Sequence, residues 1–239
     1  GVPAGEWGRL IGLDRIPDKK TLRAKADILS QGANREYLDG WIAVRAQQWI
    51  TPDEDACIGN FYLDGHVRTY FGQEKLPYRY VARQKLCMRG MTDYWVNDDC
   101  GNPFFVVTTA FSKGLIASLK EDIIPRLLPL VPELTTEQLE QNIPRLTMIF
   151  DREGFSMKLF KELWDRYRIA CQTYNKYPKE DWPDEEFRTV TDETLFGTFT
   201  EVRIAERLIS PLKDFEIREV RYQTEGDRQV SIVSGDCRP

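Results

Sequence analysis

Two apolar runs that each close on an aspartate constrain the fold of this chain more than any other feature. The run CIGNFYL leads into Asp64 and Gly65, and the run RLTMIF leads into Asp151. Each run has the length and apolar content of a strand, and Asp-Gly is a common turn dipeptide. We therefore predict that both aspartates stand at strand ends, and that HVRTYFG (66–72) returns across a tight turn as the partner of the first strand.

Apolar strands and amphipathic helices alternate after the first run. PFFVVTTA (103–110) has the composition of a central strand, and RIACQTY (168–174) has that of a further strand. Helices are predicted after Ser112, with Pro125 kinking or ending the helix, and after Ser156. A meander followed by alternating helices and strands predicts an α/β fold with a mixed five-stranded sheet flanked by helices.

Different patterns flank the predicted sheet. Residues 1–54 have helical spacing, and residues 181–239 alternate polar and apolar positions around a TEGD turn. We therefore divide the chain into a helical N-terminal segment (1–54), a core (55–180) and a β-rich segment (181–239). The first predicted helix has a basic side that is either solvated or in contact with DNA, and it carries Lys19, Lys20, Arg23 and Lys25.

The composition narrows the function classes. A net charge of -5 argues weakly against a free-standing nucleic-acid binder, although 33 Lys and Arg leave room for a local basic face. Five cysteines without C-x-x-C spacing and a single histidine supply too few ligands for zinc sites, so we expect reduced thiols. No apolar stretch approaches the ~20 residues that span a bilayer, and no signal peptide is present. These features predict a cytoplasmic protein without a membrane partner.

Strand-end aspartates at one edge of a sheet have a specific chemistry. Ligands of such sheets collect at the carboxyl ends of strands, where Asp64 and Asp151 are expected to meet. Two converging carboxylates repel each other unless they are protonated or bridged by cations. Two magnesium ions ~3.5–4 Å apart can activate a nucleophile and stabilise the leaving oxygen of a phosphodiester. The pair therefore favours metal-dependent phosphoryl transfer on nucleic acid.

Longer motifs of the chain resemble a known family. The segments YLDGHVRTYFG, KLPYRYVARQKLCMRGMTDYWVND, PFFVV and FDREGFSMKLFKELW are similar to segments of DDE transposases of bacterial insertion sequences, and the likeness runs from about Gly12 to Ile232. The resemblance implies a ribonuclease-H-like fold, shared with retroviral integrases. It also implies that Asp64 and Asp151 are catalytic acids that hold two Mg²⁺ or Mn²⁺ ions. The implied partner is double-stranded DNA, as transposon ends and target, bound by a homodimer in a bacterial, nucleoid-associated setting.

A third acid, usually a glutamate, is implied on a helix that follows a β-rich insertion. The stretch after Tyr174 corresponds to that insertion, and the sequence stops where the helix is expected to begin. We therefore expect a fragment without its third metal ligand, which leaves its activity open. Glu201, Glu206 and Glu219 are poor substitutes because they lie in segments of period two or in the insertion.

Several residues near the aspartates have two interpretations. His66 either touches a phosphate or a metal-bound water, or points to solvent. Asn97 and Asp98 either form a turn or hydrogen-bond to the metal ligands, and Tyr94 and Trp95 are expected to be packing residues. Glu153 is expected to act in a turn or as a helix cap, with a stand-in metal ligand as the alternative.

A basic segment interleaved with Tyr78 and Tyr80 is either a solvated loop or a DNA-binding surface. Beside an acid pair we favour DNA backbone contacts with stacking on the tyrosines. Its cationic residues are Lys75, Arg79, Arg83, Lys85 and Arg89.

Three functions are compatible with these features. The first is a transposase catalytic core that cleaves and joins DNA, and the second is a catalytically inactive, DNA-binding remnant of one. The third is an unrelated metal-dependent phosphohydrolase, which no G-x-S-x-G motif, P-loop or nucleotide fingerprint supports.

Overall fold

The structure is a computed structural model of the 239-residue chain. It describes residues 18–29, 44, 59–73, 75–81, 84–99, 101, 103–193, 199–223 and 228–237. The chain forms two compact units, residues 1–49 and 50–239, and each is described by itself.

In the first unit, helix α2 (Lys19–Leu29) corresponds to the first predicted helix, which carries Lys19, Lys20, Arg23 and Lys25. Asp18 accepts backbone hydrogen bonds from Lys20 at 2.6 Å and from Thr21 at 3.2 Å. These bonds satisfy N–H groups that have no partner within the helix, and they lower the pKa of the Asp18 carboxyl. The rest of the N-terminal segment for which helical spacing was predicted (1–54) lies outside the described residues except for Val44, which is helical.

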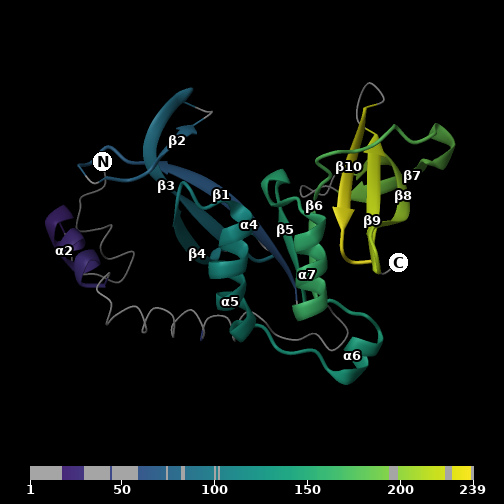
Figure 1. Cartoon of the computed structure of the whole chain (residues 1–239), viewed down its shortest axis with the longest axis horizontal. Helices are drawn as coiled ribbons and strands as arrows, with labels where there is room; N and C mark the ends of the chain where they lie inside the picture. The colour runs from purple at the N-terminus through teal and green to yellow at the C-terminus, as the bar shows by residue number, and fades with distance from the viewer. Residues whose placement is uncertain are drawn as a thin grey trace. The chain divides into compact units, whose positions relative to one another are not determined.

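The second unit is built on one mixed sheet of ten strands rather than the five predicted. The strands lie in the order β2-β3-β1-β5-β6-β10-β9-β8-β7, and β4 pairs with β3 (Figure 1). Their bounds are β1 Asn60–Thr69, β2 Tyr78–Val81, β3 Leu86–Asn97, β4 Pro103–Ala110, β5 Leu146–Phe150, β6 Ile169–Tyr174, β7 Arg188–Glu193, β8 Phe199–Leu212, β9 Phe215–Gln223 and β10 Gln229–Ser234.

The central strands combine both kinds of pairing. β1 runs antiparallel to β3, and β3 runs antiparallel to β4. On its other side β1 is parallel to β5, and β5 is parallel to β6. This mixed arrangement agrees with the predicted α/β fold. Strand β4 was predicted to be central, but among the described strands it pairs only with β3.

The predicted turn at Asp64 and Gly65 is wrong, because β1 continues through both residues to Thr69. The partner of β1 is β3, in a segment that was predicted to be a loop. Gly65 lies opposite Tyr94, and a Cβ added at Gly65 would stand 3.0 Å from Cε1 of that ring. The glycine therefore makes room for an aromatic ring within the sheet instead of turning the chain.

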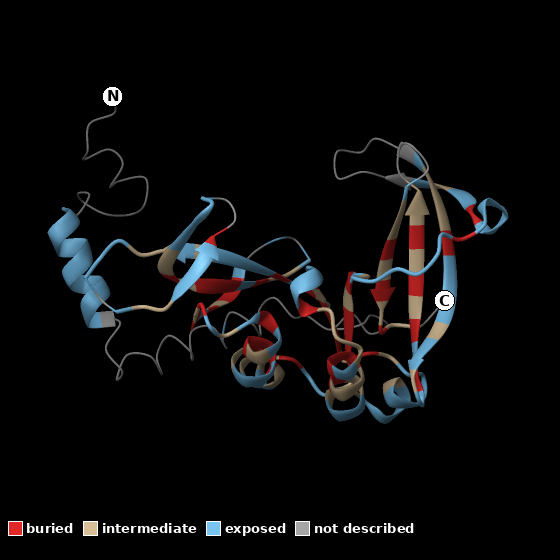
Figure 2. Ribbon diagram, turned by 45° about the horizontal axis from the view of Figure 1, so that its top comes forward, coloured by how far each residue is buried: buried red, intermediate tan, exposed pale blue. Residues whose placement is uncertain are grey.

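Helices cover one face of the central strands (Figure 1). The rings of Phe150 on β5 and Phe160 on α7 pack edge to face, with centroids 6.0 Å apart. Buried residues collect where the helices meet the strands (Figure 2). The helical segments are α4 Leu115–Ser118, the π-helical η1 Leu119–Ile123, α5 Ile124–Leu127, the 3-10 turn η2 Leu128–Leu130, α6 Thr136–Glu140, the 3-10 turns η3 Arg152–Gly154 and η4 Asp184–Glu186, and α7 Met157–Tyr167.

Pro125 neither ends the helix that contains it nor stands in a regular α-helical run. Proline has no N–H for the usual bond to the preceding turn, and its ring crowds the carbonyl there. The chain accommodates it with the wider π-helical turn of η1 immediately before α5. The helix begins after Gly114 rather than at Ser112, whereas Ser156 caps α7 as predicted, accepting from the Leu159 N–H at 3.3 Å.

The C-terminal strands extend the same sheet. The predicted hairpin is confirmed, since β9 and β10 pair antiparallel from Gln223 and Gln229 onward. β10 then pairs with β6 and so joins the hairpin to the central strands. Buried positions alternate along β9 with partly or fully exposed ones, as expected for a strand with one face in a core (Figure 2).

A buried ion pair fastens the segment after β6 to this hairpin. Arg221 donates from Nε to Glu219 at 2.9 Å and from Nη1 to the Glu180 carbonyl at 2.8 Å. The Trp182 ring lies between two guanidinium groups, 4.3 Å from that of Arg207 and 4.4 Å from that of Arg221. Cation–π contacts of this kind are strongest where water is excluded, and Trp182 is buried.

Candidate active site

Asp64 and Asp151 are brought together by the parallel register of β1 and β5. Leu63 pairs with Phe150, and each aspartate is the next residue of its strand. The backbone at Asp151 remains extended, with φ −76° and ψ 179°, so it prolongs β5 beside β1. Neighbouring parallel strands are about 4.8 Å apart, and paired residues direct their side chains to the same face. The structure thus places the two carboxylates together, although Asp64 lies within its strand and not at its end.

The acid pair lies on the sheet face opposite the helices. Phe61 and Leu63 are buried, whereas Tyr62 and Asp64 are exposed, which is the alternation of a strand with one covered face. Leu63 shares its face with Phe150, whose ring packs on α7. Both aspartates therefore present their side chains on the exposed face.

Trp95 and His66 lie beside Asp64 on this face. Trp95 is the residue directly opposite Asp64 on β3, and 39% of its surface is exposed. The prediction that Trp95 is a packing residue is therefore wrong, because its side chain is partly exposed. His66 is exposed two positions beyond Asp64, opposite Asp93.

Besides the acid pair, this face carries the carboxylate of Asp93, which is bonded to other residues. Asp93 accepts from Arg68 at 3.0 Å and from the Thr108 hydroxyl at 2.7 Å, and it is buried. Its two partners come from the neighbouring strands β1 and β4. This arrangement links three strands and leaves Asp93 a structural role.

Glu153 is tied to Asp151 through the backbone. The Glu153 N–H donates to Oδ1 of Asp151 at 2.7 Å, so Asp151 caps the short turn η3. The Glu153 carboxylate lies 3.6 Å from the Arg79 guanidinium on β2. The turn after the second aspartate thus joins the acid pair to the basic hairpin.

Tyr94 lies on the helix-covered side of the same region. Only 1% of its surface is exposed, and its hydroxyl has no hydrogen-bond partner among the described residues. Burial, with contributions from the charges of Glu153 and Asp151, raises the pKa of Tyr94 to about 12, although the Arg79 charge opposes the shift. The phenol therefore keeps its proton and can serve as a donor.

Asn97 and Asp98 lie toward the start of β1. Asn97 is opposite Tyr62, two positions from the level of Asp64. The carbonyl of Asp98 accepts from the Gly101 N–H at 3.0 Å, which is a turn contact.

The basic segment forms an antiparallel hairpin of β2 with the first half of β3. Its exposed rings are Tyr78 and Tyr80, with 64% and 58% of their surfaces accessible, and the Arg89 guanidinium lies 5.0 Å from the Tyr78 centroid. Lys85 takes a left-handed conformation (φ 53°) near the turn. Of the other predicted DNA contacts, Lys75 precedes β2, Arg79 lies on it, and Arg83 lies outside the described residues.

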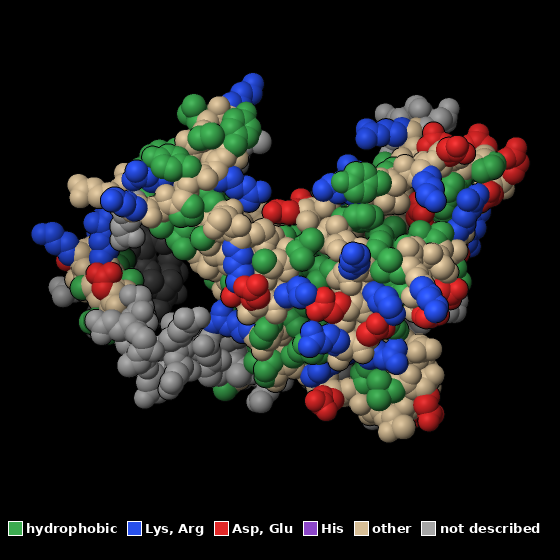
Figure 3. All heavy atoms as spheres, in the orientation of Figure 1, with side chains coloured by type: hydrophobic (Ala, Val, Ile, Leu, Met, Phe, Trp, Pro, Cys, Tyr) green, Lys and Arg blue, Asp and Glu red, His purple; other side chains and the backbone are tan. Residues whose placement is uncertain are grey.

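On the helical face, unlike on the basic hairpin, Lys and Arg side chains form ion pairs with neighbouring Asp and Glu. Figure 3 shows Lys and Arg side chains interspersed with Asp and Glu over the helices. Lys113 contacts Asp122 at 2.6 Å, and Glu162 on α7 accepts from both Lys120 and Arg166. This face is therefore internally neutralised, in contrast to the hairpin.

A family model described as a transposase protein matches residues 2–238, nearly the whole chain. The chain belongs to this transposase family. No curated protein matches the sequence of this transposase.

One solved structure similar to this transposase is described as the cryo-EM structure of the piggyBac transposase synaptic complex with hairpin DNA. The two chains are 14% identical with a TM-score of 0.48, and the match covers 93% of this chain. This transposase spans 41% of that chain's length.

The acid pair has the donor chemistry for a divalent cation, because exposed carboxylates are the ligands that Mg²⁺ and Mn²⁺ prefer. Within the described ranges, however, no group of three or more His, Cys, Asp or Glu side chains could hold a metal. Glu219 is buried against Arg221, and Glu206 faces Arg188 at 3.2 Å. Within the described ranges, the structure aligns Asp64 with Asp151 and places no third acid in a cluster with them.

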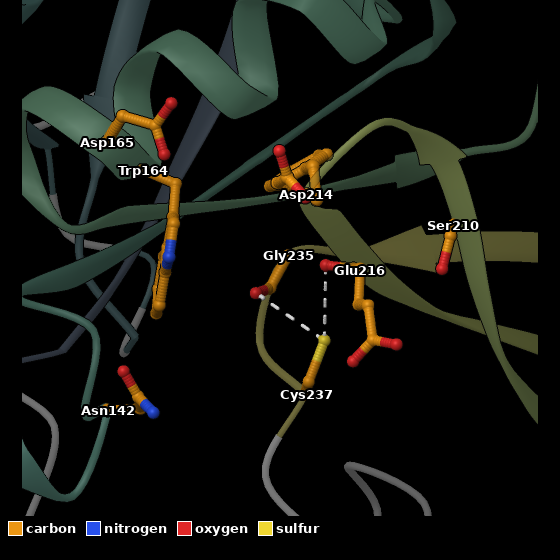
Figure 4. A pocket seen from close by; sticks show the side chains of 9 residues that line it. Asn142, Trp164, Asp165, Ser210, Asp214, Glu216, Gly235 and Cys237 are labelled. Carbon is orange, nitrogen blue, oxygen red and sulfur yellow. Dashed lines mark hydrogen bonds between the residues drawn. The ribbon is translucent and has the colours of Figure 1, made fainter.

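A pocket of about 670 Å³ lies elsewhere on the chain, between α7 and the β8–β9 hairpin. Figure 4 shows Trp164 and Asp165 on one side, with Ser210 and Glu216 on the other. The Cys237 thiol donates to the Glu216 carbonyl at 3.4 Å. None of the predicted site residues lines this pocket.

Sequence reasoning missed the surroundings that β3 contributes. Tyr94, Trp95 and Asp93 all lie on that strand, next to β1. The sequence GMTDYWVN has no regular alternation of polar and apolar residues, so it carried little signal for a strand with one exposed face. Separately, no helix in the described part of the chain is long and apolar enough to cross a membrane.

Proposed function

We propose that this transposase cleaves and joins DNA by metal-dependent phosphoryl transfer, with Asp64 and Asp151 as metal ligands. The observation that carries the proposal is the register of β1 and β5, which puts the two aspartates on one face of the sheet. Divalent ions held by such a pair activate a water or a DNA 3′-hydroxyl and stabilise the leaving oxygen. The carboxylates fix where the ions sit, and the Glu153 N–H orients the Asp151 carboxylate.

The strand arrangement supports the finer assignment to the ribonuclease-H-like DDE transposases of bacterial insertion sequences. The order β4-β3-β1-β5-β6 has three antiparallel strands followed by two parallel ones. The acids lie on β1, the central strand of that order, and directly after its neighbour β5. The motifs of the sequence led to the same family, which uses a third acid that we include in the proposal.

The partner we propose is double-stranded DNA, at transposon ends and target, bound by a homodimer. The exposed tyrosines and cations of the β2–β3 hairpin suit phosphate contacts and stacking. The Arg79–Glu153 contact connects this surface to the acid pair. Sedimentation of the protein with paired element ends tests the dimer.

Cleavage of element-end DNA with Mg²⁺ or Mn²⁺ tests the catalytic assignment. Asp64→Asn and Asp151→Asn keep the size of each side chain and remove its charge, so both should reduce cleavage at least 100-fold, in line with the contribution of charge stabilisation at active sites. Asp165→Asn, on α7, is the matched control and should cleave like the wild type. Cleavage that survives either active-site change would contradict the assignment.

A second candidate is a DNA-binding protein without cleavage activity. It is favoured by the absence, within the described ranges, of a third acid beside the pair. It predicts salt-dependent binding to DNA and no metal-dependent nicking by the wild type. Nicking that Asp64→Asn abolishes would exclude it.

A further inference from the structure

Exposed aromatic rings gather on the sheet face that carries the acid pair. The aromatic residues of β1, β3, β5 and β6 that are exposed are Tyr62, Trp95 and Tyr174. Tyr62 precedes Asp64 by two residues on β1, and Trp95 lies directly opposite Asp64 on β3. The aromatic residues of these strands that face the helices are buried. The exposed rings are therefore concentrated beside the acid pair.

Tyr174 lies on the other side of the acid pair from Trp95. Ile149 of β5 pairs with Gln172 of the parallel strand β6. Asp151 and Tyr174 each lie two residues beyond that pair in extended backbone, so they share one level and one face of the sheet. The two rings thus stand at the ends of a row across β3, β1, β5 and β6, with both carboxylates between them. Three strand spacings, about 14 Å, separate their backbones.

The Tyr174 ring holds a cation that has no carboxylate partner. The guanidinium of Arg152, which follows Asp151 directly, lies 5.4 Å from the centroid of the ring. Among the described residues no ion pair engages Arg152, which is exposed, whereas Lys120 on the helical face is paired. An arginine that lies on a ring keeps the donors at its edge available, and these match phosphate oxygens. The row therefore offers stacking surfaces together with a phosphate contact.

This combination fits DNA whose bases are unpaired. An aromatic side chain stacks on the face of a base, and every base has such a face whatever its sequence. Within a duplex the neighbouring base pairs cover these faces, so the rings of the row have access to them only where the strand is melted, single-stranded or at an end. A duplex lying across the row would contact the guanidinium of Arg152 but would leave both rings without a partner.

We propose that Trp95 and Tyr174 are stacking platforms for unpaired nucleotides of the DNA strand that crosses the acid pair, with Arg152 bound to a phosphate of the same strand. The site thereby selects a melted or single-stranded segment over an intact duplex. The inference rests on the proposed action of the acid pair on DNA, but the binding it describes needs no metal ion.

Fluorescence anisotropy of the whole chain in EDTA tests the inference without cleavage, with a labelled mixed-sequence oligonucleotide and the blunt duplex of the same sequence. Trp95→Ala and Tyr174→Ala should each weaken binding of the single strand about 5- to 150-fold, which corresponds to the loss of one base stack. Both variants should bind the blunt duplex within about twofold of the wild type, because its base faces are covered. Trp95→Phe and Tyr174→Phe keep an aromatic face and should retain most of the affinity for the single strand.

Two further variants define the roles of the ring and the cation at β6. Arg152→Gln should reduce the slope of log K against log salt by about 0.7 for the single strand, as expected for one lost phosphate contact. Tyr174→Leu keeps apolar bulk on β6 without a ring, so it decides the role of Tyr174 if Tyr174→Ala loses its cooperative melt. Tyr177→Ala removes an exposed ring elsewhere on the chain and is the matched control, which should bind both DNAs like the wild type.

The outcomes separate this inference from the proposed function. Failure of the wild type to bind the single strand, equal losses on both DNAs, or unchanged affinity in Trp95→Ala and Tyr174→Leu would each overturn the inference. Asp64→Asn should bind the single strand at least as tightly as the wild type, because it removes a negative charge beside the phosphates. Cleavage that survives Asp64→Asn would instead overturn the proposed function, whatever the affinities of the ring variants.

Discussion

Asp64 and Asp151 are register neighbours on two parallel strands, each one residue past the last pair, Leu63 and Phe150. Nothing in the local sequence of either residue requires this, because three strands and several helical segments lie between β1 and β5 along the chain. The ladder between β1 and β5 sets the alignment, and a slip of one residue would move one carboxylate to the covered face. The proximity of two like charges has a consequence for stability.

Neutralising either aspartate should stabilise the metal-free protein. Like charges directly opposite on neighbouring strands are destabilising, so Asp64→Asn should raise the free energy of unfolding by roughly 0.2–1 kcal/mol. The same change should abolish the increase in melting temperature that Mn²⁺ gives the wild type. Thermal melts with and without Mn²⁺ measure both effects. A lower metal-free stability in Asp64→Asn would show that the pair does not repel.

Substitution of Gly65 should be costly although its backbone is an ordinary strand. A Cβ at this position would stand only 3.0 Å from the buried Tyr94 ring, which is tighter than ordinary van der Waals contact, so Gly65→Ala should lower the free energy of unfolding by about 1–3 kcal/mol. Chemical denaturation measures the loss. Gly114→Ala is the matched control, since its Cβ would meet only the Glu153 carboxylate at 3.9 Å, and it should change stability by less than about 0.5 kcal/mol.

Substitutions in the β2–β3 hairpin should distinguish the electrostatic contribution to DNA binding from the stacking contribution. Lys75→Gln and Lys85→Asn should each reduce the slope of log K against log salt by about 0.9, whereas Tyr80→Ala should weaken binding with an unchanged slope. Fluorescence anisotropy over a range of salt concentrations gives both quantities. Lys158→Gln, an exposed change on α7, should leave affinity and slope as they are. Equal effects of all four variants would argue against a binding surface on the hairpin.

The ion pair beneath Trp182 should contribute strongly to stability. Arg221→Met leaves the Glu219 carboxylate buried without its cation and should cost about 3–5 kcal/mol. Trp182→Ala removes the ring between the two guanidinium groups and should cost a similar amount. Tyr177→Ala, at an exposed ring, should change little. Urea unfolding measures the free energy of unfolding of the three variants and so ranks the three losses.

Tyr94 should make stability depend on alkaline pH. Its pKa is raised in the folded protein to about 12, from the usual tyrosine value of 10.0, so the folded state holds this proton more tightly than the unfolded state. The resulting stabilisation is complete below pH 10 and is lost as the pH rises through 12, by roughly 2–3 kcal/mol in total. Tyr94→Phe lacks this contribution, so the wild type should lose more stability than the variant between pH 10 and 12. Denaturant titrations at several pH values measure the free energy of unfolding of both proteins. An equal loss for the two proteins between pH 10 and 12 would contradict the raised pKa of Tyr94.

Strong local signals explain what the sequence predicts well. β4, β5, α7 and β6 follow from apolar runs, a serine cap and helical periodicity, and each lies within a residue or two of its predicted position. The alignment of Asp64 with Asp151 was predicted from two strand ends that meet at one edge of a sheet. The structure aligns them by the register of β1 and β5 instead, because Asp64 lies within β1.

Long-range packing explains what could not be predicted. Gly65 has the sequence signature of a turn, but the reason for the glycine is a ring 29 positions later, by the difference 94 − 65. Gly90 is similar, since a Cβ there would stand 2.5 Å from the Phe111 ring. β3 follows a segment rich in Lys, Arg and Tyr and itself contains one glycine, Gly90, so it was interpreted as part of a loop. The role of its residues beside Asp64 was missed for the same reason. No local sequence pattern indicates which aromatic side chain will pack against a given glycine.

The pairing of β10 with β6 also affects how the protein can be shortened. Ile232, Val233 and Ser234 supply the neighbour that β6 would otherwise lack on that side. A chain cut after Tyr174 would turn a buried strand into an open edge of unpaired backbone groups, which invites strand-to-strand aggregation. Deleting the β-rich segment to obtain a minimal catalytic domain should therefore yield insoluble protein, unless a replacement strand or a solubilising edge is designed in its place.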